Sequence, residues 1–245
     1  LPKDHDIYKL GEIAYNCIQS QKIVFDSGDL QGLGERFSDR KRGCGVLTAR
    51  PIRCDPKSKK SAIESFFFIH LTVQEFLAAV YVSLLTADRQ CEVWARYLGE
   101  PHMAQVWRFY CGLTKLQHFD RLQKRINSYP IGFQMQCLFE TQDISFVRRL
   151  MPHIVGEEVK VRPKTAYDST AYGYCLSVLP SLKRLTIEKG GSSAEVHRLL
   201  EPVYASGVLQ TLHQPNGEEQ FHQIFVFYLD TNLNTFEYGI GFNLY

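Results

Sequence analysis

FFFIHLTVQEFLAAVYVSLL, residues 66–85, is the stretch that decides the fold. Its first four residues are bulky and apolar and too few for a helix, so 66–69 predicts a short strand. Thr72 and Glu75 match the S/T-x-x-E capping box of a helix start. The apolar residues that follow recur at three- and four-residue spacing and predict one buried helix face: Val73, Phe76, Leu77, Val80, Tyr81, Leu84 and Leu85.

His70 lies between this strand and this helix, beside a helix N-terminus whose partial positive charge favours anions. The position predicts a contact with a phosphate. The alternative is a structural histidine that binds only within the protein, which is the commoner role of a single histidine. A membrane span is excluded because Gln74 and Glu75 lie near the centre of the stretch, where an acid costs about 2.5–3.5 kcal/mol.

The stretch resembles the strand-to-helix signature of the winged-helix domain in NOD-like receptors, the NACHT and leucine-rich-repeat sensors. The residues that match the family pattern F-x-F-x-H-L-T-x-Q-E-F-x-A-A are Phe66, Phe68, His70, Leu71, Thr72, Gln74, Glu75, Phe76, Ala78 and Ala79. In that family the histidine contacts the phosphates of an ADP held by the neighbouring nucleotide-binding domain. The resemblance implies that His70 is a cofactor-binding residue for ADP or ATP, shared with a domain absent from this sequence.

The residues before the signature predict the rest of a winged helix: a helix over 7–19, short strands over 23–25 and 44–48, and a weaker helix over 30–37. A basic cluster lies in the predicted loops: Arg36, Arg40, Lys41, Arg42, Arg50, Arg53, Lys57, Lys59 and Lys60. Because a basic wing can contact DNA phosphates, a DNA-binding winged-helix regulator is an alternative function. The cluster lacks side chains that read bases, so we do not expect nucleic acid as a partner.

Residues 87–160 predict helices joined by short loops, as in a bundle of αα-hairpins. One helix follows Pro101, a weaker one covers 122–126, and another begins at Asp143 and ends at Pro152. The segments 106–113 and 137–143 resemble the second helical domain of the same receptors.

Near the C-terminal end, the helical pattern gives way to leucines at the spacing of a repeat. Leu182-x-x-Leu185-x-Ile187 matches the strand of a leucine-rich repeat, and Leu209 restarts it twenty-seven residues later, within the range of such repeats. A helix over 194–207 lies between them, with Val196, Leu199, Leu200 and Val203 predicted to face inward. His213 departs from the repeat pattern in the second strand.

Composition and motifs limit the kinds of chemical site that we expect in this chain. The chain has 245 residues, 44% of them hydrophobic, a net charge of +2 and seven cysteines with no C-x-x-C pair or zinc-like spacing. We therefore expect thiols, no metal site and no signal peptide. The sequence contains no G-x-x-x-x-G-K-S/T loop and no G-x-S-x-G motif, so we expect no enzyme activity and no catalytic residue. A start at Leu1 without Met suggests a piece of a longer protein.

The sequence thus predicts a mostly α protein with short β strands, an α+β class. Its expected domains are a winged helix over 1–86, a helical domain over 87–164, a leucine-rich-repeat entry and first repeat over 165–215, and an unassigned aromatic-rich tail over 216–245.

The resemblance implies the regulatory and sensor part of a cytoplasmic innate immune receptor, which restrains an ADP-bound nucleotide-binding domain missing from this chain. Its implied partners are that N-terminal domain, a protein or microbial ligand at the repeats, and further receptor copies in an oligomer on activation. The other alternative is a helical scaffold module without nucleotide contact.

Overall fold

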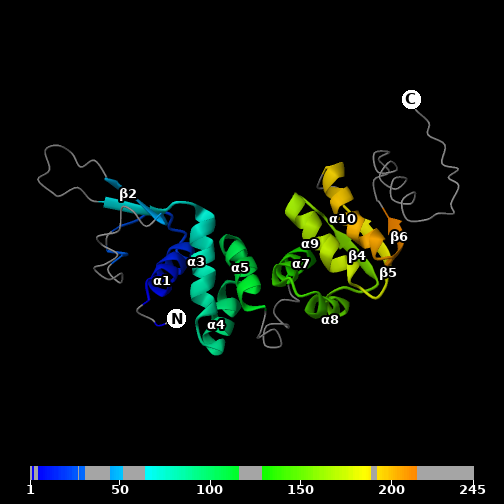
Figure 1. The fold of residues 1–245 in the computed structure, drawn as a ribbon, viewed down its shortest axis with the longest axis horizontal. Helices are drawn as coiled ribbons and strands as arrows, with labels where there is room; N and C mark the ends of the chain where they lie inside the picture. Colours follow the sequence, from blue (N-terminus) through cyan, green and yellow to red (C-terminus); the bar gives the residue numbers. More distant parts are fainter. Residues whose placement is uncertain are drawn as a thin grey trace, which may run out of the picture. The chain divides into compact units, whose positions relative to one another are not determined.

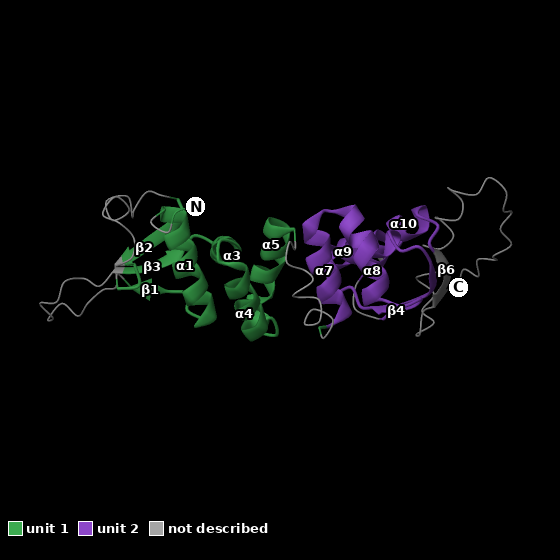
Figure 2. Ribbon diagram, turned by 90° about the horizontal axis from the view of Figure 1, so that it is seen from below, with its two compact units in different colours: residues 1–129 green, residues 130–245 purple. Residues whose placement is uncertain are grey.

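The structure is a computed structural model of the chain. It describes residues 2, 5–26, 28–30, 45–51, 64–115, 129–188 and 192–213. The chain divides into two compact units, Leu1–Tyr129 and Pro130–Tyr245, coloured green and purple in Figure 2. Helices dominate both units and the strands are short, which confirms the predicted mostly α class. The finer predicted division into domains stays a prediction.

The first unit combines a small sheet with a group of helices (Figure 1). In chain order its elements are α1 (Asp6–Gln19), β1 (Phe25–Asp26), β2 (Leu47–Pro51), β3 (Glu64–Phe68), α3 (Leu71–Ser83), α4 (Ala87–Tyr97), the 3₁₀ turn η1 (Pro101–Met103) and α5 (Ala104–Thr114).

The phenylalanine run forms the central strand of an antiparallel sheet with the order β1-β3-β2. Phe66 and Phe68 are buried and alternate with the half-buried Phe67, as the two-residue period of a strand requires. Phe25 pairs with Phe66 in the register, and its ring centroid lies 5.5 Å from that of Phe68. The predicted strand is therefore present, although it begins and ends slightly earlier than 66–69.

Helix α3 is present as predicted, but its buried face is a different one. Its buried residues are Gln74, Ala78, Ala79 and Val82, whereas Phe76 is 42% exposed and the other predicted core residues of the helix are half-buried. The reason is that α3 packs against α1 on one side and α5 on the other. Where two neighbouring helices approach α3 closely, only its small residues fit between the backbones. The buried face of α3 is therefore the one that carries small residues.

Helices α1 and α3 meet at backbone distance. A Cβ atom placed on Gly11 would lie 2.7 Å from the Leu77 carbonyl oxygen and 2.9 Å from the Tyr81 Cβ. The Tyr81 hydroxyl donates a hydrogen bond to Glu12 Oε1 at 3.2 Å, and its ring lies 5.2 Å from that of Tyr8. Only glycine allows this approach.

A buried glutamine joins three helices at the C-terminal end of α3. Gln90 of α4 donates from Nε2 to the carbonyl oxygens of Ser83 and Leu85 at 3.0 and 2.8 Å. Its Oε1 accepts from the Tyr110 hydroxyl of α5 at 2.6 Å. Beside it, the buried rings of Trp94 and Trp107 lie 4.7 Å apart. Burial raises the pKa of Tyr110, which keeps its hydroxyl a donor.

The second unit contains α7 (Ile131–Thr141), α8 (Ile144–Ile154), β4 (Glu158–Val161), α9 (Ala166–Ser177), β5 (Leu182–Ile187), α10 (Ser193–Ala205) and β6 (Leu209–His213). Its strands form a parallel sheet with the order β4-β5-β6, and α9 packs against α10. The four residues predicted to face inward from α10 are all buried.

The leucine period of the sequence equals the register of this sheet. Leu182 pairs with Leu209 and Leu185 pairs with Leu212, so each pair joins residues twenty-seven positions apart. The departure at His213 does not end the strand, because His213 pairs with Thr186. Strand β4 was not predicted, since it is short and its alternation covers only Val159 and Val161.

Three pairs of oppositely charged, exposed side chains connect β4 and β5 or the residues next to them. Lys160 lies 3.6 Å from Glu188, Arg184 lies 3.8 Å from Glu158, and Lys183 forms an ion pair with Glu157. All six side chains are largely exposed, so each pair adds little to stability. The three pairs define a charged ladder across the two strands.

Two details of the helical predictions are wrong. Helix α8 begins after Asp143, whose side chain accepts from the Phe146 N–H as expected, but it continues through Pro152 to Ile154. Pro152 lies in the last turn, where it removes a single helix hydrogen bond. Leu113 shares the helical spacing of Val106 and Tyr110 in the sequence, but it is 43% exposed whereas those two residues are buried.

Several predictions lie outside the described residues. They are the helix over 30–37, the helix over 122–126, the cysteines Cys44 and Cys54, and the tail over 216–245. In the described part of the chain, no helix is long and apolar enough to cross a membrane.

The contact at Gly11 predicts a steric effect. Gly11→Ala should lower the free energy of unfolding by about 1–3 kcal/mol, because the added methyl group overpacks a helix contact made by backbone atoms. Urea unfolding followed by tryptophan fluorescence measures it, since both tryptophans lie in the first unit. Asn16→Ala is the control, because Asn16 is an exposed residue of the same helix and lies in the unit that the tryptophans report. Equal stability of the two variants would contradict the contact.

The bonds of Gln90 predict a second effect on stability. Gln90→Leu should lower the free energy of unfolding by about 1–3 kcal/mol, because the Tyr110 hydroxyl is left buried without its acceptor. Adding Tyr110→Phe should recover part of the loss, since replacing both partners removes the unsatisfied group. A double-mutant cycle in urea tests this, and strictly additive losses would show that the two side chains are not coupled.

Candidate functional site

His70 caps the N-terminus of α3. Its backbone is extended, with φ −148° and ψ 144°, and its Nδ1 accepts a hydrogen bond from the Thr72 N–H at 3.1 Å. The residue is exposed. A neutral imidazole whose Nδ1 accepts must carry its proton on Nε2. The geometry therefore leaves Nε2–H as the donor that an external group can meet.

The predicted capping box of Thr72 and Glu75 is wrong. The Ile69 N–H still bonds to the Val46 carbonyl beside the sheet at 3.0 Å, and α3 begins at Leu71, two residues after Ile69. His70 thus takes the capping position, and its ring satisfies the N–H that belongs to Thr72. The sequence pattern was read two residues too late.

The chain uses the same cap at α1. His5 precedes the helix with extended backbone, and its Nδ1 accepts from the Ile7 N–H at 3.2 Å. Histidine is not among the preferred capping residues, which are Ser, Thr, Asp and Asn. Two histidine caps in one chain show that capping alone can account for a histidine at such a position.

Glu75 is half-buried on the second turn of α3. Burial raises the pKa of its carboxyl group, and the positive charge of Arg108 acts in the opposite direction. Arg108 belongs to α5, where its Nη1 donates to Gln105 Oε1 at 2.9 Å. Glu75 is therefore an acid with a nearby cation, not a capping residue.

A pocket of about 550 Å³ opens beside Glu75. Its walls come from residues 18–23 at the end of α1, 71–75 at the start of α3 and 101–108 of η1 and α5. We call it the Gln74 pocket, after the buried glutamine in its wall. His70 itself is not part of the wall.

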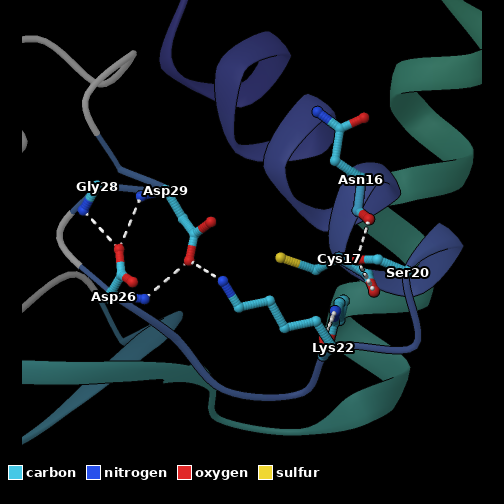
Figure 3. Close-up of polar contacts among 8 residues, drawn as sticks. Asn16, Cys17, Ser20, Lys22, Asp26, Gly28 and Asp29 are labelled. Atoms are coloured by element: carbon cyan, nitrogen blue, oxygen red, sulfur yellow. Dashed lines mark hydrogen bonds and ion pairs between the residues drawn. The ribbon is translucent and has the colours of Figure 1, made fainter.

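The segment that follows α1 is held by a network of polar contacts (Figure 3). Asp26 Oδ1 accepts from the backbone N–H groups of Gly28 and Asp29, and Asp29 Oδ2 accepts from the Asp26 N–H at 2.8 Å. The Lys22 ammonium pairs with Asp29. Gln74 Nε2 donates to the Lys22 carbonyl oxygen at 3.3 Å, which ties this wall of the pocket to α3.

The other predicted features give no second site. Of the basic cluster, only Arg50 lies in the described part of the chain, on β2 and exposed. Among the described residues no group of three or more His, Cys, Asp or Glu side chains could hold a metal. The cysteines described carry thiols: Cys17, Cys91, Cys111, Cys137 and Cys175.

The sequence reasoning missed the Gln74 pocket entirely. Its walls come from three segments up to ninety residues apart, and no local pattern links them. The one signal was the buried glutamine itself, a polar residue on a helix face that the apolar spacing did not predict.

Comparison with known proteins gives distant relatives of one kind. No protein-family model matches the chain. The chain is 24% identical over 244 residues to NACHT, LRR and PYD domains-containing protein 3 of Bos taurus, covering 80% of this chain and 23% of the relative. The human protein of that name is 22% identical over 226 residues, covering 74% and 21%.

Human NACHT, LRR and PYD domains-containing protein 5 is 26% identical over 220 residues, covering 73% of this chain and 17% of that protein. The chain thus spans about a fifth of the length of the curated relatives it matches. These matches agree with the resemblance carried by residues 66–79. The chain is therefore related to the NACHT, LRR and PYD domains-containing proteins of the NOD-like receptor family.

Proposed function

We propose that the chain is the regulatory part of a NOD-like receptor, which restrains a nucleotide-binding domain through His70. The observation that supports this most directly is the place of His70: an exposed imidazole at the N-terminus of α3, inside the receptor signature. The names of the relatives given above include a NACHT domain. In this family the NACHT domain is the nucleotide-binding domain.

The chemistry at His70 suits a phosphate. Nε2–H is a hydrogen-bond donor, and the N-terminus of a thirteen-residue helix adds partial positive charge beside it. Leu71 and Thr72 are exposed, so the start of the helix is open to an approaching group. This arrangement can hold an ADP phosphate, and no group of three or more metal-ligating side chains lies among the described residues. We therefore propose binding of ADP or ATP without catalysis.

The proposed mechanism is a switch. In the intact receptor, His70 holds the phosphate of ADP on the nucleotide-binding domain and keeps the molecule closed. Loss of this contact frees that domain to assemble with further receptor copies. Repeats continuing from the β4-β5-β6 sheet would meet a protein or microbial ligand. In this proposal the receptor is cytoplasmic and serves innate immune signalling.

A scaffold module without nucleotide contact is the second candidate. The observation that favours it is the His5 cap, because His5 makes the same bond to the start of α1. If capping were the whole role of His70, any good capping residue would replace it. The two candidates therefore predict different effects on ADP binding for a substitution of His70 that preserves the cap.

His70→Asn separates capping from phosphate contact. Asparagine is a preferred capping residue, so α3 keeps its start, but the ring donor is lost. In the full-length receptor we expect the dissociation constant for ADP to rise about tenfold or more, because a hydrogen bond to a charged group contributes about 1.5–3 kcal/mol. Basal signalling should rise with it. Radiolabelled ADP retention on the purified receptor is the measurement.

His5→Asn is the matched control, since it makes the same exchange at the cap of α1 and should leave ADP retention unchanged. Thermal unfolding of both variants checks that the caps survive. Unchanged ADP retention in His70→Asn, with normal folding, would refute the phosphate role and leave the scaffold candidate.

A further inference from the structure

The Gln74 pocket has the size and lining of a small-molecule site. Its volume of about 550 Å³ falls in the usual range for such sites, roughly 300–1,000 Å³. Its apolar wall is formed by Ile18, Ile23, Leu71, Pro101 and Ala104. Ile23 and Leu71 are 63% and 50% exposed, so apolar surface faces solvent at the opening. A ligand that covers it would gain hydrophobic stabilisation.

Carboxamides supply the polar part of the lining. Gln74 is 1% exposed and uses its Nε2 to hold the Lys22 carbonyl, so its Oε1 is an acceptor in the pocket wall. Gln105 uses its Oε1 to accept from Arg108, so its amide N–H groups are donors. The wall thus offers one acceptor and one donor of the amide type, the combination that a carboxamide ligand can satisfy with its own N–H and C=O.

The charges in the wall are compensated within the protein. The Lys22 ammonium pairs with Asp29. The Arg108 guanidinium acts on the Glu75 carboxyl group and bonds to Gln105. A charged ligand would have to compete with these internal partners and would be partly desolvated in doing so. The pocket therefore favours a ligand without net charge.

One polar group in the wall, on His102, lacks a partner. His102 Nε2 is shielded from solvent and has no hydrogen-bond partner among the described residues. Its Nδ1 faces Glu100 Oε2 at 3.9 Å, beyond hydrogen-bond distance. A buried polar atom left without a partner costs about 1–3 kcal/mol, so a ligand that bonds to it relieves that cost.

We propose that the Gln74 pocket binds a neutral aromatic or heteroaromatic carboxamide. The ring of such a ligand would cover Ile23 and Leu71, its C=O would accept from Gln105, and its two N–H groups would donate to Gln74 Oε1 and His102 Nε2. This site is separate from His70 and does not depend on a nucleotide-binding domain. It can therefore be tested on the chain by itself.

Three probes of one shape and different charge test the proposal: benzamide, benzoate and benzamidine. Saturation-transfer NMR titrations on the purified chain measure the affinity of each. We expect benzamide to bind about three- to tenfold more tightly than either ion, the ratio expected for about one net hydrogen bond. Tighter binding of benzoate would mean an uncompensated cation in the wall and would overturn the neutral-ligand proposal. Absence of saturable benzamide binding would overturn it as well.

Two variants place the binding in this pocket. Ala104→Leu fills the wall and should abolish benzamide binding, whereas Ala194→Leu, an exposed alanine of α10 in the second unit, should leave it unchanged. His102→Phe keeps a ring but removes the unpartnered nitrogen. It should weaken benzamide about three- to tenfold while thermal stability stays equal or rises.

Circular dichroism melting of each variant shows that it is folded. Should Ala104→Leu fail to fold, His102→Phe decides the question, because its ring conserves the packing. Benzamide binding that survives both wall variants in folded protein would show that the probe binds elsewhere and would refute the site.

Discussion

The close contact between α1 and α3 is the constraint on which the first unit depends. Gly11 allows the backbone of α1 to lie against Leu77 and Tyr81, and α5 covers the opposite side. With two neighbours this close, α3 buries the small residues Ala78, Ala79 and Val82 along its middle and end, and Gln74 near its start. Gln90 holds the C-terminal end of the helix to α4 and α5.

Burial within this unit divides the receptor signature into buried residues, exposed residues and the half-buried Glu75. Phe66, Phe68, Gln74, Ala78 and Ala79 are buried, so the packing of the sheet and of α3 is enough to account for them. The exposed members are His70, Leu71, Thr72 and Phe76. His70 makes the cap and the Phe76 ring lies 5.5 Å from that of Phe109, whereas burial does not account for Leu71 and Thr72. The exposed group is therefore where a role outside this unit has to be sought.

The sequence predicted elements better than it predicted their faces. Apolar spacing located α1, β3, α3 and α10, and the leucine period predicted the register of β5 with β6. It misjudged α3, because spacing reports which residues share a face but not how near a neighbouring helix comes. It also placed the start of α3 two residues late, since Thr72 and Glu75 matched a pattern that His70 made unnecessary. The Gln74 pocket could not be predicted, because its walls meet only through the packing of three helices.

The charged ladder on β4 and β5 has a consequence for how any molecule would reach that face. Each of its cations pairs with an anion, as in Lys160 with Glu188 and Arg184 with Glu158. Fields from paired charges cancel within a few ångströms, and salt screens what remains beyond a Debye length of about 8 Å. Diffusing molecules of either charge are therefore not steered to this face from a distance. Any selectivity it has must arise at contact, from the order of its charges, and the rate of encounter should depend little on ionic strength.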